Sequence, residues 1–167
     1  FTISPKMKIL IIKLSSIGDV IHTLPVLSAI RKGLPNAEID WVVEKKSAEI
    51  LRNNPLINNL IEVDTKSLRT KDSFGKNLSL ARENLRDLRS TKYDITLDFQ
   101  GLFKSAAIAK LARAKKRIGF AKEFLREPGS RFLLSETFSV ESQTNIVRKN
   151  LSLAEKALKI QIPEKDF

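Results

Sequence analysis

The chain has 167 residues, a formal net charge of +11 at pH 7, one histidine and no cysteine. This length fits one domain that buries about two-thirds of its unfolded surface. The lack of cysteine excludes a disulfide framework and, with one histidine, the ligand spacings of zinc sites, so no metal is expected. The positive charge favours a polyanionic partner: nucleic acid, an anionic membrane or a phosphorylated substrate. The alternative is a lysine-rich composition without functional meaning.

No apolar run approaches the roughly 20 residues that a membrane-spanning helix needs. Residues 1–6 lack the apolar core of a signal peptide, and Met7 directly precedes the first strand pattern. Residues 1–6 are therefore expected to be a short extension or an expression remnant.

The predicted elements alternate between strands and helices along the chain. Because this alternation is typical of βαβ units, the predicted fold is an α/β, Rossmann-like three-layer sandwich with a parallel sheet. Apolar runs predict strands at Lys8–Leu14, Glu38–Val43, Asn59–Val63, Tyr93–Asp98 and Arg117–Phe120. Helical spacing of apolar residues predicts helices at Gly18–Gly33, Ser47–Arg52, Asn77–Arg89, Lys104–Ala112 and Gln143–Leu158.

Three stretches interrupt this pattern. Pro25 falls inside the first predicted helix and is expected to kink or restart it. Residues 65–76 are polar and read as a loop, and residues 121–140 have no clear period. Long loops in a compact domain are often functional, so both are expected to border a cleft.

The loop after the first strand concentrates groups that bind or react. Ligands of open α/β sheets sit at the carboxyl ends of the strands. This loop offers backbone N–H groups, two hydroxyls, a cation and a carboxylate, from Lys13, Ser15, Ser16, Gly18 and Asp19.

Each of these residues also has a purely structural interpretation. Asp19 can cap the helix, and the two serines can close the turn. Gly18 can be an ordinary loop glycine, or it can allow a positive φ or the close approach of a ligand. Lys13 can be a solvated strand end.

Two further positions are candidates for binding. Gln100 and Lys104 follow the fourth strand, where Gly101 lets the chain turn and Ser105 can cap the next helix. His22 lies three residues after Asp19 on the same helix face and can tune it or bind a ligand, although a lone histidine is more often structural.

Four blocks together resemble one enzyme family. They are K-x-S-S-x-G-D-x-x-H-x-L-P from Lys13, I-D-W-V-V-E from Ile39, D-F-Q-G-L-F-K-S from Asp98, and R-E-P from Arg126. In this order they resemble the bacterial lipopolysaccharide heptosyltransferases, glycosyltransferase family 9, type I more than type II. The resemblance runs from Met7 to about Lys159. It departs at Asn145, where related sequences often carry a histidine, so no role is assigned there.

The resemblance implies half of a two-domain enzyme. Family members are about twice this long and have two Rossmann-like domains in the GT-B arrangement. Residues 7–160 would be the acceptor-binding domain and residues 161–167 the start of the interdomain linker. The C-terminal domain, which in this family holds most of the nucleotide sugar, is absent from this sequence. The chain alone is therefore expected to be inactive.

The resemblance also implies the reaction. Heptose would move from ADP-heptose to a Kdo residue of Kdo-lipid A with inversion, without a metal or cofactor. Asp19 matches the family's catalytic base, although a helix N-terminus lowers a carboxylate pKa and so weakens the base unless proton transfer is late. The expected acceptor-binding residues are Lys13, Ser15, Ser16, Gly18, His22, Arg69, Lys71, Gln100, Lys104 and Arg126.

Some of these residues keep other interpretations. Arg126 can form an ion pair with Glu123 or Glu127, and Arg69 and Lys71 can be solvated loop residues. The implied partners are the anionic glycolipid acceptor and the C-terminal domain, with no nucleic acid, and the implied location is cytoplasmic and peripheral at the inner face of the inner membrane.

Two rival functions remain open at this point. One is another family 9 sugar transferase, such as heptosyltransferase II. The other is a standalone basic α/β module that binds RNA or anionic lipid. A receiver domain is disfavoured because Lys13 stands where that fold needs an acidic pair.

Overall fold

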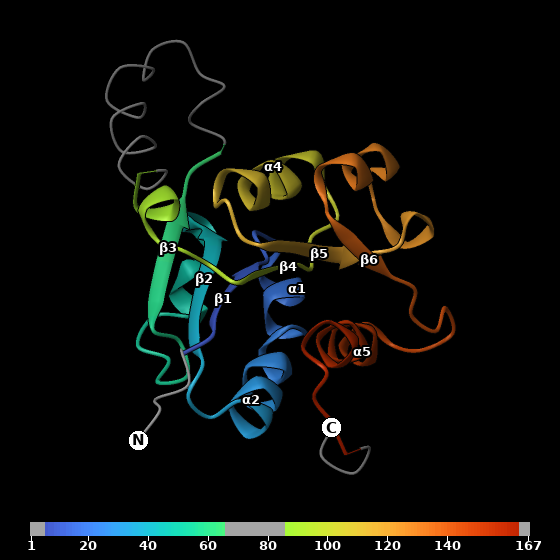
Figure 1. Cartoon of the computed structure of the whole chain (residues 1–167), viewed down its shortest axis with the longest axis horizontal. Coiled ribbons are helices and arrows are strands. Elements are labelled where there is room, and N and C mark those ends of the chain that lie inside the picture. The colour runs from blue at the N-terminus through green and yellow to red at the C-terminus, as the bar shows by residue number, and fades with distance from the viewer. Residues whose placement is uncertain (1–5, 66–85, 164–167) are drawn as a thin grey trace.

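A computed structural model describes residues 6–65 and 86–163 of the chain. Within these residues, six strands form one parallel sheet in the order β3-β2-β1-β4-β5-β6 (Figure 1). The predicted α/β sandwich with a parallel sheet is confirmed. The strands are β1 (Lys8–Ile12), β2 (Glu38–Glu44), β3 (Asn59–Val63), β4 (Ile95–Asp98), β5 (Lys116–Phe120) and β6 (Glu136–Phe138).

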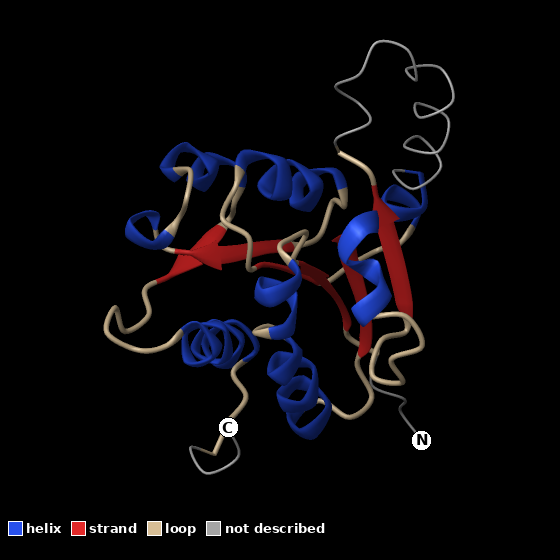
Figure 2. Cartoon of the chain, turned by 180° about the vertical axis from the view of Figure 1, so that it is seen from behind, coloured by secondary structure: helices blue, strands red, loops and turns tan. Residues whose placement is uncertain are grey.

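Helices cover both faces of the sheet, as Figure 1 and the reverse view in Figure 2 show. One face carries α1 (Ile17–Ile21), α2 (Leu24–Gly33), the 3₁₀ helix η1 (Lys45–Ile50) and α5 (Ile146–Leu158). The other face carries α4 (Phe103–Leu111), with the 3₁₀ helix η5 (Pro128–Leu133) beside it. A third 3₁₀ helix, η4, spans Lys122–Phe124, and residues 86–90 are also helical.

The described residues form a hydrophobic core on each face of the sheet, and the central strand β1 contributes to both cores. Ile9 and Ile11 lie in the core under α1, α2 and α5, whereas Leu10 and Ile12 lie in the core under α4. All four side chains are fully buried. A strand covered on both faces needs a continuous apolar run rather than an alternating one, and the sequence of β1 meets this need.

The first predicted helix divides where Pro25 stands. Helix α1 ends at Ile21, and α2 begins at Leu24, so that proline occupies the first turn of α2. Proline is tolerated there because the first helical N–H groups have no partner within the helix. The predicted restart at Pro25 is therefore confirmed.

Other boundaries differ from the prediction. Strand β6 was not predicted: it has only three residues, inside the segment without clear period, and it pairs with β5 at the sheet edge. The predicted helix Ser47–Arg52 is instead the 3₁₀ helix η1. Most of the predicted helix Asn77–Arg89 lies outside the described residues. No helix among the described residues has the length and apolar character to cross a membrane.

Candidate functional site

The loops after β1 and β4 meet at one edge of the sheet. The two strands are parallel neighbours, with Ile12 opposite Asp98, so their carboxyl ends lie side by side. The N–H of Phe99 continues the pairing by donating to the carbonyl of Ile12 at 3.0 Å. Residues that follow the two strands therefore share one small volume, at the edge where ligands bind in α/β folds.

Asp19 presents a carboxylate at this edge from the first turn of α1. Its Oδ2 accepts hydrogen bonds from the Ser16 N–H at 3.2 Å and from Arg126 Nη2 at 3.3 Å. Burial, the largest single influence, acts to raise the pKa of Asp19, but the Ser16 N–H and the charges of Lys13 and Arg126 together hold it below its ordinary value. The carboxylate is thus ionised at neutral pH and remains partly exposed.

Lys13 follows the last residue of β1 and is buried next to Asp19. Its side chain is buried, and Nζ donates to the carbonyl of Phe99 at 3.0 Å. Burial lowers the pKa of Lys13, and the nearby Asp19 opposes that effect. The alternative that Lys13 is a solvated strand end is wrong, because the strand end is covered by the loop after β4.

Gln100 ties the two loops together. Its side chain is buried, and Oε1 accepts the N–H groups of Leu14 at 3.0 Å and Ser15 at 3.2 Å. The amide oxygen of Gln100 therefore holds the loop that leads to Asp19.

Asp98 organises the loop that carries Gln100. Its Oδ1 accepts the N–H groups of Gln100 at 2.8 Å and Gly101 at 3.2 Å, while Oδ2 accepts the hydroxyl of Ser105 at 2.9 Å. Burial raises the pKa of Asp98 to about 6. Sequence reasoning gave Asp98 no role. The sequence did indicate such a role, because a carboxylate at the end of a buried strand, shortly before a glycine turn, needs hydrogen-bond donors from nearby residues.

The two glycines near the site have different roles. Gly101 has a φ of +70°, as the predicted turn requires, and a Cβ there would lie 3.4 Å from the backbone nitrogen of Arg126. Gly18 lies inside α1 without a positive φ, so the positive-φ alternative is wrong, whereas the close approach of a ligand stays a prediction. A Cβ on Gly18 would meet no atom within 4 Å, which leaves open space beside the backbone.

Arg126 is brought to Asp19 by contacts on either side of the glycine turn. The N–H of Glu127 donates to the carbonyl of Gly101 at 3.1 Å, and the N–H of Phe103 donates to Glu127 Oε2 at 2.6 Å. The expected alternatives, ion pairs of Arg126 with Glu123 or Glu127, are wrong, because the Arg126 guanidinium contacts Asp19.

Lys104 points along the same edge towards β2. Its Nζ lies 3.1 Å from Oε1 of the buried Glu44 and 3.3 Å from the hydroxyl of Thr65, which also donates to Glu44. Glu44 borders a hollow of about 280 Å³ that Lys45, Lys46 and Asp64 also line. Neither Glu44 nor Thr65 was predicted, although Glu44 ends a buried strand.

Three further predicted residues are described by the structure and are more exposed than Lys13 and Gln100. Ser15 is half-buried, and Ser16 and His22 are exposed. The carbonyl of His22 accepts a hydrogen bond from Asn150 at 3.3 Å. Arg69 and Lys71 lie outside the described residues. Across residues 6–65 and 86–163, no group of three or more His, Cys, Asp or Glu side chains could hold a metal ion.

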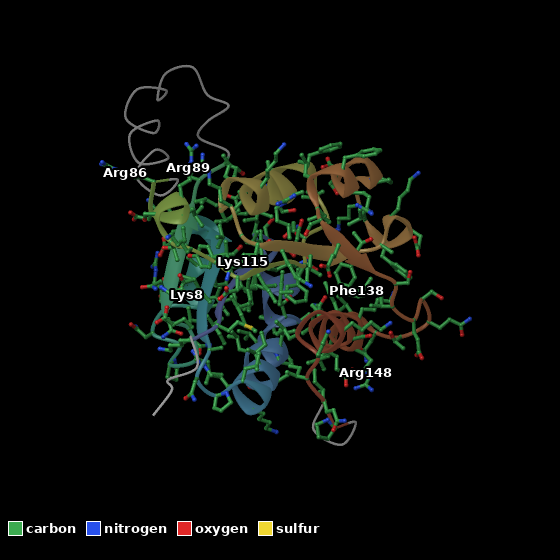
Figure 3. The ribbon with its side chains drawn as sticks, in the orientation of Figure 1. Lys8, Arg86, Arg89, Lys115, Phe138 and Arg148 are labelled. Carbon is green, nitrogen blue, oxygen red and sulfur yellow. The ribbon has the colours of Figure 1, made fainter. Side chains whose placement is uncertain are left out.

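The positive charge extends beyond this edge. Figure 3 shows Arg86 and Arg89 at one end of the molecule, far from Arg148. Lys115 pairs with Asp94 at 2.7 Å, near the start of β4 and away from the site. Net charge alone therefore does not locate a ligand, whereas Lys13, Asp19 and Arg126 lie together at one edge of the sheet.

Comparison with solved structures shows the same architecture. The structure described as E. coli heptosyltransferase WaaC with ADP aligns with a TM-score of 0.88 at 30% identity, over 95% of this chain and 49% of that chain. A glycosyl transferase family 9 structure from Veillonella parvula shares the fold, with a TM-score of 0.73 at 22% identity.

Sequence comparison gives a family. The chain is 33% identical over 160 residues to lipopolysaccharide heptosyltransferase 1 of Escherichia coli, and 32% identical over 164 residues to that of Pseudomonas aeruginosa. These matches cover 95% of this chain but 50% and 44% of the relatives, so the chain spans about half their length. The family model for glycosyltransferase family 9 (heptosyltransferase) matches residues 81–166, more than half of the chain. The chain belongs to glycosyltransferase family 9.

Proposed function

We propose that this chain is the acceptor-side half of an inverting lipopolysaccharide heptosyltransferase. The observation that carries the proposal is the ionised, partly exposed carboxylate of Asp19, held between Lys13 and Arg126 at the carboxyl ends of β1 and β4. Relatives named lipopolysaccharide heptosyltransferase 1, and a solved relative that binds ADP-2-deoxy-2-fluoro heptose, support the substrate class. The donor would be ADP-heptose and the acceptor a Kdo residue of Kdo-lipid A.

In this mechanism Asp19 is the general base. As the acceptor oxygen forms its bond to the anomeric carbon of heptose, the bond to ADP breaks on the opposite side, which inverts the configuration. The acceptor proton passes to the carboxylate of Asp19. The lowered pKa of Asp19 suits a late proton transfer, because the attacking oxygen becomes strongly acidic only once its new bond has largely formed.

The cations beside Asp19 suit an anionic acceptor. Arg126 is exposed and offers a planar guanidinium for a carboxylate or phosphate, with Ser15, Ser16, Gly18 and His22 along the same loop and helix. Lys13, Gln100 and Lys104 also make contacts within the protein, so any contact with the acceptor would use their remaining donors. Arg69 and Lys71 stay predicted acceptor ligands.

The complete enzyme would need a second Rossmann-like domain for most of the donor contacts. The length of the relatives, about twice the matched region, supports this arrangement. We place the enzyme in the cytoplasm, peripheral at the inner face of the inner membrane, because its proposed acceptor is a lipid. No cofactor or metal takes part in the proposed step.

The decisive experiment replaces the base in the parent protein, expressed from its complete reading frame. Asp19→Asn keeps the size of the side chain and an oxygen for the Ser16 N–H but removes the base. We expect turnover to fall by about 10²–10⁴-fold with little change in acceptor affinity, as is typical for loss of a general base. The measurement is steady-state heptose transfer with varied acceptor.

A matched control separates chemistry from folding. Asp94→Asn removes another partly exposed carboxylate, which accepts the backbone N–H of Lys8 away from the site. It should leave turnover near that of the wild type. If Asp19→Asn retains more than about a third of wild-type turnover, Asp19 only caps the helix and the proposed mechanism is wrong.

A further inference from the structure

The layer formed by α4 and η5 carries an aromatic and basic surface. Phe132 is 89% exposed, Phe103 is 51% exposed and Leu111 is 38% exposed. Single exposed apolar residues are ordinary, but Phe132 leaves unused nearly all the free energy that burial of a phenylalanine would provide. These three residues lie on two adjoining elements, on the face of the sheet opposite α1, α2 and α5 (Figures 1 and 2).

The start of η5 packs against α4, and the end of η5 is tied to β5. At one end, a Cβ on Gly129 would lie 2.5 Å from Cζ of Phe103, so the phenyl ring rests on the backbone at the start of η5. At the other end, Arg117 Nε donates to the carbonyl of Leu133 at 2.9 Å. The helix η5, which carries Phe132, therefore adjoins α4 at its start and β5 at its end.

Helix α4 turns one face outward. Phe103, Lys110 and Leu111 are spaced seven and eight residues apart, which places them on one side of a helix. All three are exposed, whereas Ser105, Ala106, Ile108 and Ala109 on the other side are buried against the sheet. The outward face thus combines apolar side chains with a cation.

The charge along α4 and the residues that flank it is positive, apart from the exposed carboxylate of Glu127 at the Phe103 end. No acidic residue occurs between Asp98 and Glu123, while Lys and Arg recur throughout that stretch. Lys104, Lys115 and Lys116 pair with acidic residues elsewhere. Lys110, Arg113 and Arg131 form no ion pair with any described residue.

We propose that the α4–η5 surface docks on an anionic lipid bilayer. Phe132, Phe103 and Leu111 would enter the interfacial region while Lys110, Arg113 and Arg131 meet the headgroups. The proposal rests on the proposed function, because a glycolipid acceptor presents its sugars at a membrane. Phe103 also adjoins the site, since its N–H bonds the residue next to Arg126, so docking here would bring the Asp19 edge close to the bilayer.

Vesicle binding by the 167-residue chain tests the surface directly. The probes are phosphatidylcholine vesicles with and without phosphatidylglycerol. We expect binding only to the anionic vesicles, weakening as salt rises. Phe132→Ser and the double variant Lys110→Gln/Arg113→Gln should each partition about tenfold or more weakly, since buried apolar area and surface cations both contribute to interfacial binding.

Matched controls lie on the opposite layer. Ile146→Ser changes a 39% exposed apolar residue at the start of α5, and Lys32→Gln/Lys159→Gln removes the same charge from exposed positions on α2 and after α5. Both should bind vesicles like the wild type. Because Phe132 is almost fully exposed, its replacement should not change the melting temperature.

A fluorescent variant gives a readout that does not depend on losing a signal. Trp41 is the only tryptophan and is fully buried, so its emission should not respond to lipid. In Phe132→Trp, the new indole should shift its emission to the blue on adding anionic vesicles, whereas the one in Ile146→Trp should not.

Two results would overturn the proposal. One is that Phe132→Ser binds anionic vesicles as strongly as the wild type does, and the other is that the emission of Phe132→Trp does not change when these vesicles are added. If Phe132→Ser instead dissolves a dimer seen by light scattering and leaves vesicle binding intact, the surface binds a second copy and not a membrane. These vesicles contain no acceptor sugar, so the outcome is independent of heptose transfer. Transfer by the parent protein to a water-soluble Kdo acceptor tests the proposed function separately.

Discussion

Asp98 shapes the candidate site although it is fully buried. Its two oxygens accept two backbone N–H groups and one hydroxyl, which fixes the turn at Gly101 and the position of Gln100. Burial nevertheless raises its pKa to about 6. A carboxyl whose folded pKa exceeds its unfolded value binds a proton more readily when folded, so its ionisation lowers stability as pH rises through that range.

This gives a prediction for Asp98→Asn, which keeps one acceptor oxygen and cannot ionise. Between about pH 4 and pH 7, wild type should lose about 2 kcal/mol of unfolding free energy relative to Asp98→Asn. This is most of the roughly 3 kcal/mol that a pKa shift from 3.8 to about 6 gives over the whole titration. Urea unfolding of both proteins across this pH range measures the difference.

Asp94 serves as a control because its pKa shifts in the opposite direction to that of Asp98. The Lys115 side chain and the Lys8 N–H hold its pKa below the ordinary value, against the effect of burial. Wild type should therefore gain stability relative to Asp94→Asn as pH rises through the low end of the same range. A difference between wild type and Asp98→Asn that does not change with pH would show that Asp98 has the same pKa folded and unfolded.

At the scale of elements, one side chain couples the ends of β1 and β4. Gln100 Oε1 receives both N–H groups at the start of the loop after β1. The loop that carries Asp19 therefore depends on a residue 86 positions away from Leu14.

Gln100→Met should be destabilising because it keeps the volume of the side chain but removes the acceptor. Two backbone N–H groups, one of them buried, would lose their hydrogen-bond acceptor. Leaving a buried donor without a partner lowers the free energy of unfolding by about 1–3 kcal/mol. Denaturant unfolding measures this loss. Gln143→Met, at an exposed position before α5, is the control and should change stability little. Equal stability of the two variants would mean that water or another group replaces the amide oxygen.

The same elements show what the sequence could and could not predict. The apolar run of β1 and the position of Pro25 were enough for a strand and a helix restart, because both depend on local chemistry. Gln100 was predicted at the right edge, but whether its side chain turns towards a ligand or the backbone depends on a strand far away in sequence. The pairing of Arg126 with Asp19 spans 107 residues, so local charges suggested nearer partners.

For the whole molecule, the half-length match to the relatives leads to a prediction about nucleotide binding. The isolated 167-residue chain should fold, because its described residues already form a six-stranded sheet with a hydrophobic core on each face. It should not bind ADP or ADP-heptose measurably, since we place most donor contacts in the second domain.

Titration calorimetry of the chain with ADP measures this, with the parent protein as the positive control. Micromolar binding of ADP to the isolated chain would contradict the proposed division of acceptor and donor between two domains.

The central place of β1 also affects how the protein is made. During synthesis β1 emerges before the other five strands of the described sheet, and β2 can pair with one of its edges soon afterwards. Its other edge must wait for β4, whose Ile95 pairs with Ile9. Until then Leu10 and Ile12 lack the cover that the segment after β4 provides as α4. A ribosome stalled before residue 95 should therefore display an open strand edge that chaperones can bind, and elongation past α4 should close it.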